Sequence, residues 1–294
     1  MGLDLDHVTK PAKKLRKLLQ KMPSDPTPEE IHSFRTNARK FEATLRTIPI
    51  KPGKAFKPLF RLRKRAGKVR DMDVLTSYSM NLSCHGQQKG PEGECSVRLL
   101  EHLGAKRRKQ ATKFCAEADQ YSRQLRKNLK SAAFKLAKEA TENQRAKNHQ
   151  VSARATTSAV ELLQELAYPP RFTKRNLHPY RLKVKELRNV LRLAGNGKGA
   201  DQDFIERLGD VKDAIGEWHD WEELLAIAID LLDHSGCALL GGIKETTDIR
   251  FQRAVSVAEQ LRKQYIRPSS GRGLSKRHPK LAESVWSATS SLAA

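Results

Sequence analysis

Apolar residues recur at intervals of three and four through most of this chain, which is the spacing of one face of an α-helix. The segment 177–194 shows the pattern clearly, because Leu182, Leu187, Val190 and Leu191 fall on one side of a helix there. No segment alternates apolar and polar residues as a half-buried strand would. The pattern therefore predicts an all-α protein.

Turn and capping residues set the expected ends of these helices. Thr27 and Glu30 have the spacing of a capping box, and Pro28 suits the first position of the helix that follows. The longest helical segment, 97–148, is expected to be broken once or twice. Helices are expected at about 8–22, 27–48, 54–80, 97–148, 151–167, 176–194, 202–234 and 243–266.

The polar side of segment 177–194 is unusually basic. Four cations follow a histidine at offsets of 3, 7, 10 and 14 residues, and the set is His178, Arg181, Lys185, Arg188 and Arg192. Because an α-helix turns about 100° per residue, these side chains fall within roughly 80° of one another. The helix therefore presents a ridge of cations, which suits a bound polyanion or internal carboxylates that neutralise it.

The same ridge occurs earlier in the chain. His32, Arg35, Arg39 and Arg46 repeat the offsets of 3, 7 and 14, and Glu42 stands at the offset of 10. We refer to the two sets as the first and the second basic ridge.

A second matched pair follows the two ridges. AGKVRDMDVL contains Gly67 and Asp71, and IGEWHDWEEL contains Gly216 and Asp220. The histidines of the ridges lie 178 − 32 = 146 residues apart and the glycines 216 − 67 = 149 residues apart. Two motifs in the same order at similar separation indicate an internal duplication. The two aspartates are candidates for structural ion pairs with the ridge arginines.

The duplication predicts the domain organisation. Residues 1–148 form the N-terminal half, 149–267 the C-terminal half, and 268–294 a flexible basic tail. The polar stretch 140–155 is the expected junction.

The charge balance indicates a polyanionic partner. There are 56 lysines and arginines against 33 acids, which gives a net charge of +23. Nucleic acid, an anionic lipid surface and polyphosphate all fit such a charge. Aromatic residues make up only 6% of the chain, which disfavours a single-strand binder that stacks bases. We find no duplex-recognition module and no apolar run long enough to span a membrane.

The cysteines indicate a cytoplasmic protein without a metal centre. Four cysteines in a chain without a signal-like segment are expected to be reduced thiols. Cys84, His85 and Cys95 lie near one loop, but their spacing does not match paired zinc-binding blocks. We therefore expect no metal and no cofactor.

Residues 106–138 form a second basic region. This segment holds eleven lysines and arginines against two acids, Glu117 and Asp119. Such a run is either a solvated helix face or a binding surface, and its shortage of acids favours binding.

The two ridges, each followed by its Gly-x-x-x-Asp segment, resemble the CHAD domain, the conserved histidine α-helical domain. The pieces that carry the resemblance are HSFRTNARK, AGKVRDMDVL, LHPYRLKVKELR and IGEWHDWEEL, and it covers about residues 8–266. The resemblance implies two four-helix bundles related by pseudo-twofold symmetry around a basic central cavity. It also implies a non-catalytic protein that binds inorganic polyphosphate and associates with polyphosphate granules in the cytoplasm.

The resemblance further implies which residues bind polyphosphate. The ligands would be His32, Arg35, Arg39, Arg46, His178, Arg181, Lys185, Arg188 and Arg192. Nearby cations would contact the polyanion at the rim, namely Lys40, Lys57, Arg61, Lys64 and Lys183. Glu42 departs from the basic pattern, so the first ridge is expected to bind less strongly than the second.

Three other interpretations remain open from the sequence. The ridge arginines could be structural, paired to Asp71 and Asp220. The charge could serve a nucleic-acid-binding protein, although we expect nucleic acid only as a non-specific competitor. A metal-dependent phosphohydrolase would use His32 or His178, but neither has a cluster of nearby carboxylates in the sequence to hold a divalent ion. The sequence gives no oligomeric state and no preferred chain length for polyphosphate.

Overall fold

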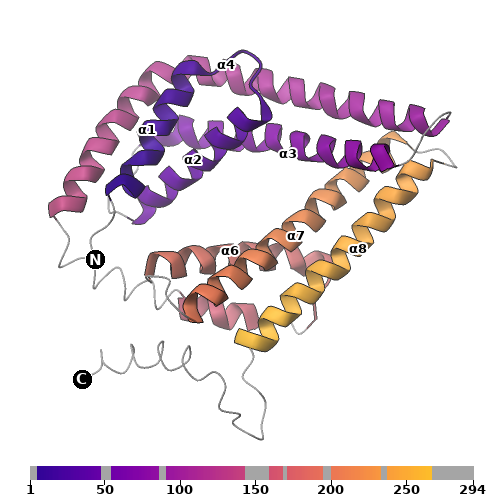
Figure 1. Ribbon diagram of the computed structural model, residues 1–294. Coiled ribbons are helices and arrows are strands. Elements are labelled where there is room, and N and C mark those ends of the chain that lie inside the picture. The colour runs from indigo at the N-terminus through magenta and orange to yellow at the C-terminus, as the bar shows by residue number, and fades with distance from the viewer. Residues whose placement is uncertain are drawn as a thin grey trace, which may run out of the picture. The chain divides into compact units, whose positions relative to one another are not determined.

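The computed structural model describes residues 5–47, 54–85, 91–142, 159–167, 171–194, 200–232 and 237–266, and all regular secondary structure in them is helical (Figure 1). The prediction of an all-α protein is confirmed. The α-helices are α1 Leu5–Lys21, α2 Pro28–Thr47, α3 Lys57–His85, α4 Pro91–Glu142, α6 Lys174–Ala194, α7 Ala200–Leu231 and α8 Ala238–Leu261. A 3-10 turn, Lys54–Phe56, precedes α3, a π-helical turn, Arg262–Ile266, follows α8, and residues 159–167 are also helical.

The N-terminus of α2 is fixed by the predicted capping box. The backbone N–H of Thr27 donates to Oε2 of Glu30 at 2.8 Å, and the N–H of Glu30 donates to Oγ1 of Thr27 at 3.3 Å. The start of α6 is capped in a similar way, because the N–H of Thr173 donates to Oδ1 of Asn176 at 2.8 Å. Both helices that carry a basic ridge therefore begin at a defined residue.

The chain divides into two compact units. Unit 1 contains residues 1–147 together with 226–242, and unit 2 contains 148–225 together with 243–294. The predicted boundary at residue 148 lies outside the described residues, as does the predicted tail 268–294. The proposed division into an N-terminal and a C-terminal half stays a prediction.

In unit 1, α1 and α2 pack against the α3–α4 pair (Figure 1). The inner face of α2 consists of Ile31, Phe34, Ala38, Phe41 and Leu45, all buried. The rings of Phe34 and Phe114 meet edge to face, with centroids 5.2 Å apart. Removing a large apolar side chain from water contributes about 1.5–3 kcal/mol, so this face holds α2 firmly on the unit.

In unit 2, α6 buries a seam that repeats every three and four residues. It consists of Leu177, Tyr180, Val184 and Leu187, and it packs in one cluster with Trp218 of α7 and with the end of α8. The sequence expectation placed Leu182 in this core, and that was wrong, since Leu182 is 53% exposed. Leu182 lies two residues beyond Tyr180, which places it about 200° around the helix from that buried side chain.

The structure corrects one further expectation. The segment 97–148 was predicted to contain one or two breaks, but α4 runs unbroken from Pro91 to Glu142. Buried residues continue along its whole inner face, from Leu99 to Leu136, and Gly104 lies within a regular part of the helix. The alanines, lysines, arginines and glutamines of this segment favour a helix, and packing against α3 and α1 supports it. None of the helices formed by the described residues is both long and apolar enough to span a bilayer.

Candidate functional site: the second basic ridge

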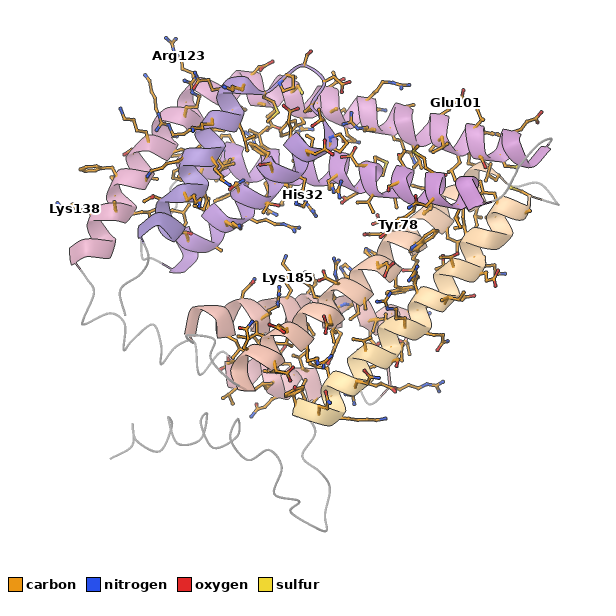
Figure 2. The ribbon with its side chains drawn as sticks, viewed as in Figure 1. His32, Tyr78, Glu101, Arg123, Lys138 and Lys185 are labelled. Carbon is orange, nitrogen blue, oxygen red and sulfur yellow. The ribbon has the colours of Figure 1, made fainter. Side chains whose placement is uncertain are left out.

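The second basic ridge lies directly beside the core seam of α6. Each core residue is followed by a polar one, so His178, Arg181, Lys185 and Arg188 flank the buried face. His178, Arg181 and Arg188 are half-buried, whereas Lys185 is exposed and projects from α6 (Figure 2). The structure thus brings these four predicted residues onto one side of the helix. The side chain of Arg192, the fifth member, lies outside the described residues.

The two described arginines of this ridge are held by the backbone of α7. Nε of Arg181 donates a hydrogen bond to the carbonyl oxygen of Lys212 at 3.2 Å. Nε of Arg188 donates to the carbonyl oxygen of Ile205 at 3.1 Å. The arginines are seven residues apart on α6 and the carbonyls seven residues apart on α7, in antiparallel order. Each guanidinium is therefore anchored through Nε, and each carries further donors on its two Nη groups.

His178 lies against a histidine that the sequence analysis did not assign to the site. Its ring centroid is 4.4 Å from that of His219 on α7, with 50° between the ring planes. Nδ1 of each ring is buried without a hydrogen-bond partner. Burial, His219 and Arg181 together lower the pKa of His178 below its ordinary value. The sequence offered one signal for His219, which is that it lies between Gly216 and Asp220, the matched residues of the repeat.

Carboxylates of α7 border His219. Its Nδ1 is 3.8 Å from Oε2 of Glu222, and its Nε2 is 3.5 Å from Oε1 of Glu223. Both ring nitrogens of His219 therefore lie near carboxylate oxygens of its own helix. The end of the ridge near His178 therefore combines two imidazoles with the guanidinium of Arg181.

The opposite end of the ridge is more acidic. Arg188 borders a surface depression of about 350 Å³, whose lining also includes Arg207 and the carboxylates of Asp203, Glu206, Asp210 and Asp213. Arg207 itself lies 3.6 Å from Asp210. Negative charge beside Arg188 opposes the binding of a polyanion there. Of the two ends of this ridge, the one at His178 and Arg181 is thus the better candidate for anion binding.

The first basic ridge, in unit 1, is more exposed. His32, Arg39 and Lys40 are exposed and Arg35 is half-buried on α2. Nε2 of His32 lies 3.5 Å from the hydroxyl of Thr36. The side chain of Arg46 lies outside the described residues. This ridge has the predicted arrangement on one helix, but His32 has no counterpart of the His178–His219 ring contact among the described residues.

Glu42 is neutralised by a neighbouring helix. Its Oε2 is 2.9 Å from Nε of Arg63 on α3. The expectation that Glu42 weakens the first ridge stays a prediction. The ion pair adds a second effect, because it removes Arg63 from the cations available to a ligand.

The predicted rim residues differ in their surroundings. Arg61 lies 3.3 Å from Glu117 and over the ring of Tyr121, and Lys183 lies 2.9 Å from Glu165. Lys57 and Lys64 are exposed on α3. Cations already paired with carboxylates are poorer ligands for a polyanion, so Lys57 and Lys64 are the better rim candidates.

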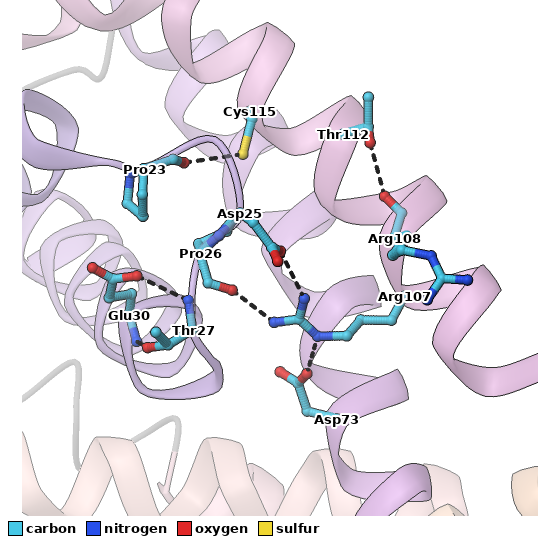
Figure 3. A network of polar contacts seen from close by, with 10 residues as sticks. All are labelled: Pro23, Asp25, Pro26, Thr27, Glu30, Asp73, Arg107, Arg108, Thr112 and Cys115. Carbon is cyan, nitrogen blue, oxygen red and sulfur yellow. Dashed lines mark hydrogen bonds and ion pairs between the residues drawn. The ribbon is translucent and has the colours of Figure 1, made fainter. Parts of the chain in front are cut away.

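An ion-pair network fixes the loop that precedes the first ridge (Figure 3). Arg107 of α4 donates through Nε to Oδ1 of Asp73 at 2.7 Å and through Nη1 to Oδ1 of Asp25 at 3.1 Å. Its Nη2 donates to the carbonyl oxygen of Pro26 at 2.7 Å. Although burial opposes its charge, these carboxylates raise the pKa of Arg107. The network positions the start of α2 and therefore His32.

This network involves Asp73 rather than the aspartate that the repeat singled out. Asp71 and Asp220 are both half-buried, and their pairing with ridge arginines stays a prediction. Asp73 is only 8% exposed. No pattern in the sequence pointed to Asp73 as a structural residue, because its partner Arg107 lies 34 residues away.

The metal expectation stays a prediction. Within the described residues there is no group of three or more histidines, cysteines or acids that could hold a metal ion. The side chains of Cys84 and His85 lie outside the described residues. Cys95 is a buried cysteine of α4 that is not part of a disulfide.

Comparison with known proteins identifies the family. The sequence model of the CHAD domain matches residues 8–228. The chain belongs to the CHAD domain family. The fold is similar to the crystal structure of the CHAD domain from the plant Ricinus communis, with a TM-score of 0.56 at 14% identity and coverage of 89% of both chains. Among curated proteins, no sequence matches this chain significantly.

Proposed function

We propose that this CHAD protein binds inorganic polyphosphate without catalysis and associates with polyphosphate granules in the cytoplasm. The observation that carries the proposal is the second basic ridge, where Arg181 is anchored to α7 beside the ring contact of His178 and His219. The finer family architecture, two pseudo-symmetric four-helix bundles from one duplication around a basic central cavity, is part of the same proposal.

The chemistry of the ridge suits a chain of phosphates. Guanidinium groups bind phosphate oxygens through short, charge-assisted hydrogen bonds and need no base to read. Arg181 and Arg188 are seven residues apart, which corresponds to about 10.5 Å along a helix. A linear polyanion can contact such cations in succession. Phosphate also favours protonated imidazole, so His178 can add a donor when the ligand is bound.

A nucleic-acid-binding function is the alternative that uses the same charge. It would depend on the number of phosphate contacts and would show a steep dependence on salt. A phosphohydrolase is less well supported, because the described residues around His178 include no cluster suited to a metal ion.

A competition titration tests the proposal. Fluorescent long-chain polyphosphate bound to the protein is displaced with duplex DNA, RNA or orthophosphate at about 150 mM salt, a concentration that screens weak surface attraction. The variant Arg181→Ala/Arg188→Ala is compared with a control of equal charge change, Lys109→Ala/Lys113→Ala, on the exposed face of α4. We expect polyphosphate to win by well over tenfold per phosphate, since the arginines are oriented and nucleic acid gains only diffuse attraction.

The two variants separate a site from diffuse charge. The ridge variant should lose the preference for polyphosphate, and the α4 control should keep it. Equal competition by DNA together with equal behaviour of the two variants would show that binding is diffuse, and the proposal would fail. Incubation with polyphosphate, followed by chain-length analysis, checks the non-catalytic part, and shortening of the chains would contradict it.

A further inference from the structure

We propose that Gly216 of α7 is a positioning residue for Arg181. Gly209 positions Arg188 in the same way, with a looser contact. The glycines would hold the guanidiniums in the orientation that receives the polyanion. The ligand in this inference rests on the proposed function, whereas the placement of the arginines does not.

The contact at Gly216 leaves no room for a side chain. A Cβ atom at Gly216 would lie 2.6 Å from Nη2, 3.0 Å from Cζ and 3.2 Å from Nε of Arg181. Three atoms of the guanidinium at such similar distances indicate that the group lies flat over the glycine. The same approach brings Nε to the carbonyl oxygen of Lys212, four residues before Gly216. The absence of a Cβ is what permits this hydrogen bond.

The arrangement repeats one heptad away. A Cβ at Gly209 would lie 3.0 Å from Nη2, 3.2 Å from Cζ and 3.3 Å from Nε of Arg188. Nε of Arg188 reaches the carbonyl oxygen of Ile205, which again lies four residues before the glycine. The fit is looser than at Gly216, so a small shift of Arg188 would accommodate a methyl group.

In unit 1, a glycine also faces a ridge arginine, but the approach is less close. A Cβ at Gly67 would lie 3.7 Å from Nε of Arg35, which is an ordinary contact. The position seven residues before Gly67 is Phe60, and the ridge position seven residues after Arg35 is Glu42. Where the ridge lacks its arginine, the facing helix lacks its glycine. This correspondence indicates that the glycines accommodate the arginines rather than helix packing in general.

The physical benefit is a preorganised cation. Glycine inside a helix is unfavourable relative to alanine, so two glycines on one face of α7 need a reason. An arginine whose Nε is already bound has fewer conformations to lose when a ligand binds its Nη groups. Replacing Gly216 with alanine should move the flexible end of Arg181 and leave both helices in place.

The first test needs no ligand. The melting temperatures of wild type, Gly216→Ala, Arg181→Ala and the double variant form a double-mutant cycle. In the Arg181→Ala background, Gly216→Ala should raise the melting temperature, because alanine favours the helix and no guanidinium opposes it. When Arg181 is present, the rise in melting temperature caused by Gly216→Ala should be smaller or should become a fall. An equal change in both backgrounds would overturn the inference.

The second test measures polyphosphate affinity at fixed salt. Gly216→Ala should weaken binding about tenfold, which corresponds to loss of one hydrogen-bonding interaction of a charged group. Gly209→Ala should have a smaller effect. Gly67→Ala and Gly241→Ala are the matched controls and should bind as wild type, since a Cβ at Gly241 meets nothing within 4 Å. Gly216→Ala should have no further effect once Arg181 is alanine.

The outcomes distinguish the inference from the proposed function. If Gly67→Ala weakens binding as much as Gly216→Ala, or if Gly216→Ala acts equally in both backgrounds, the positioning role is wrong. If wild type does not bind polyphosphate at all, the proposed function is wrong, and the melting-temperature cycle still decides whether Gly216 holds Arg181.

Discussion

The imidazole rings of His178 and His219 are in tilted contact, with centroids 4.4 Å apart, although they belong to different helices, α6 and α7. Arg181 adds a positive charge on the same side of α6, and Glu222 and Glu223 border His219 from α7. A proton on His178 therefore meets desolvation and repulsion. The titration of His178 makes unit 2 sensitive to pH near neutrality.

The first prediction concerns stability against pH. The folded pKa of His178 lies below its unfolded value, so the unfolded chain binds more protons. The stability from neutral His178 is present above the unfolded pKa, about 6.5, and is lost as the pH falls through the folded pKa. Melting temperatures should fall from about pH 7 to 5, and His178→Gln should fall less steeply.

A matched control isolates His178. His32→Gln alters the equivalent, exposed residue of the first ridge and should keep the wild-type slope. His102 of α4, whose pKa is lowered by burial and by Lys106, contributes with the same sign in every variant. An unchanged slope in His178→Gln would show that His178 does not titrate between the two states.

The second prediction concerns binding against pH. A bound phosphate chain favours protonated imidazole, so binding should take up protons. Affinity for polyphosphate should rise by about tenfold or less from pH 8 to 6, as expected for roughly one proton taken up near the pKa of histidine. The variant His178→Gln should show a flatter profile. Titration calorimetry in buffers of different ionisation enthalpy measures the proton uptake directly. A binding enthalpy that is the same in every buffer would contradict the prediction.

The third prediction concerns the network at Arg107. Arg107→Met leaves the carboxylate of Asp73 buried without its partner, and Oδ2 of Asp73 already lacks one. The free energy of unfolding should drop by about 2–3 kcal/mol, measured by urea titration. Asp25→Ala removes the exposed partner of the same guanidinium and should cost less than about 0.5 kcal/mol.

A compensating variant checks the assignment. Arg107→Met/Asp73→Leu removes both charges and should recover part of the lost stability, because neither group is then buried unpaired. If the double variant is less stable than Arg107→Met alone, the loss comes from packing and not from the orphaned carboxylate.

The fourth prediction concerns the outer face of α4. Lys109, Lys113, Arg123, Lys127 and Lys130 are exposed and fall within about 100° of one another on an α-helix. Figure 2 shows Arg123 projecting away from the helix. The segment 106–138 contains two acids, Glu117 and Asp119. Glu117 is buried and lies 3.3 Å from Arg61, so it does not balance the exposed cations.

Neutralising this face should separate diffuse from specific binding. The variant with glutamine at Lys113, Arg123, Lys127 and Lys130 should lose affinity for duplex DNA, and its salt dependence should become shallower by about 0.9 for each DNA phosphate that the face no longer neutralises. The preference for polyphosphate at the second basic ridge should be retained. Loss of that preference would place the polyphosphate site on α4 instead.

Much of the fold could be predicted from the sequence because helical periodicity and capping are local properties. The capping box of Thr27 and Glu30 and the burial of Trp218 follow from residues within a few positions of each other or from apolar character alone. The unbroken length of α4 could not be predicted, because its polar stretches are held by contacts with α1 and α3.

The candidate site was only partly predictable, because part of it depends on contacts between helices. The spacing of His178, Arg181 and Arg188 places them on one face of a helix whatever surrounds it. The contact of His219 with His178 and the position of Arg181 over Gly216 depend on the register between α6 and α7.

The sequence by itself determined that this protein is helical, basic and duplicated in its motifs, because these properties depend only on residue spacing and residue charge. Tertiary structure alone decided which cations of the ridges are anchored, paired or exposed. Arg61 and Lys183 face carboxylates, whereas Arg181 meets a backbone carbonyl and a glycine. That difference arises from contacts between residues 18 or more positions apart, and the periodicity of one helix carries no information about them.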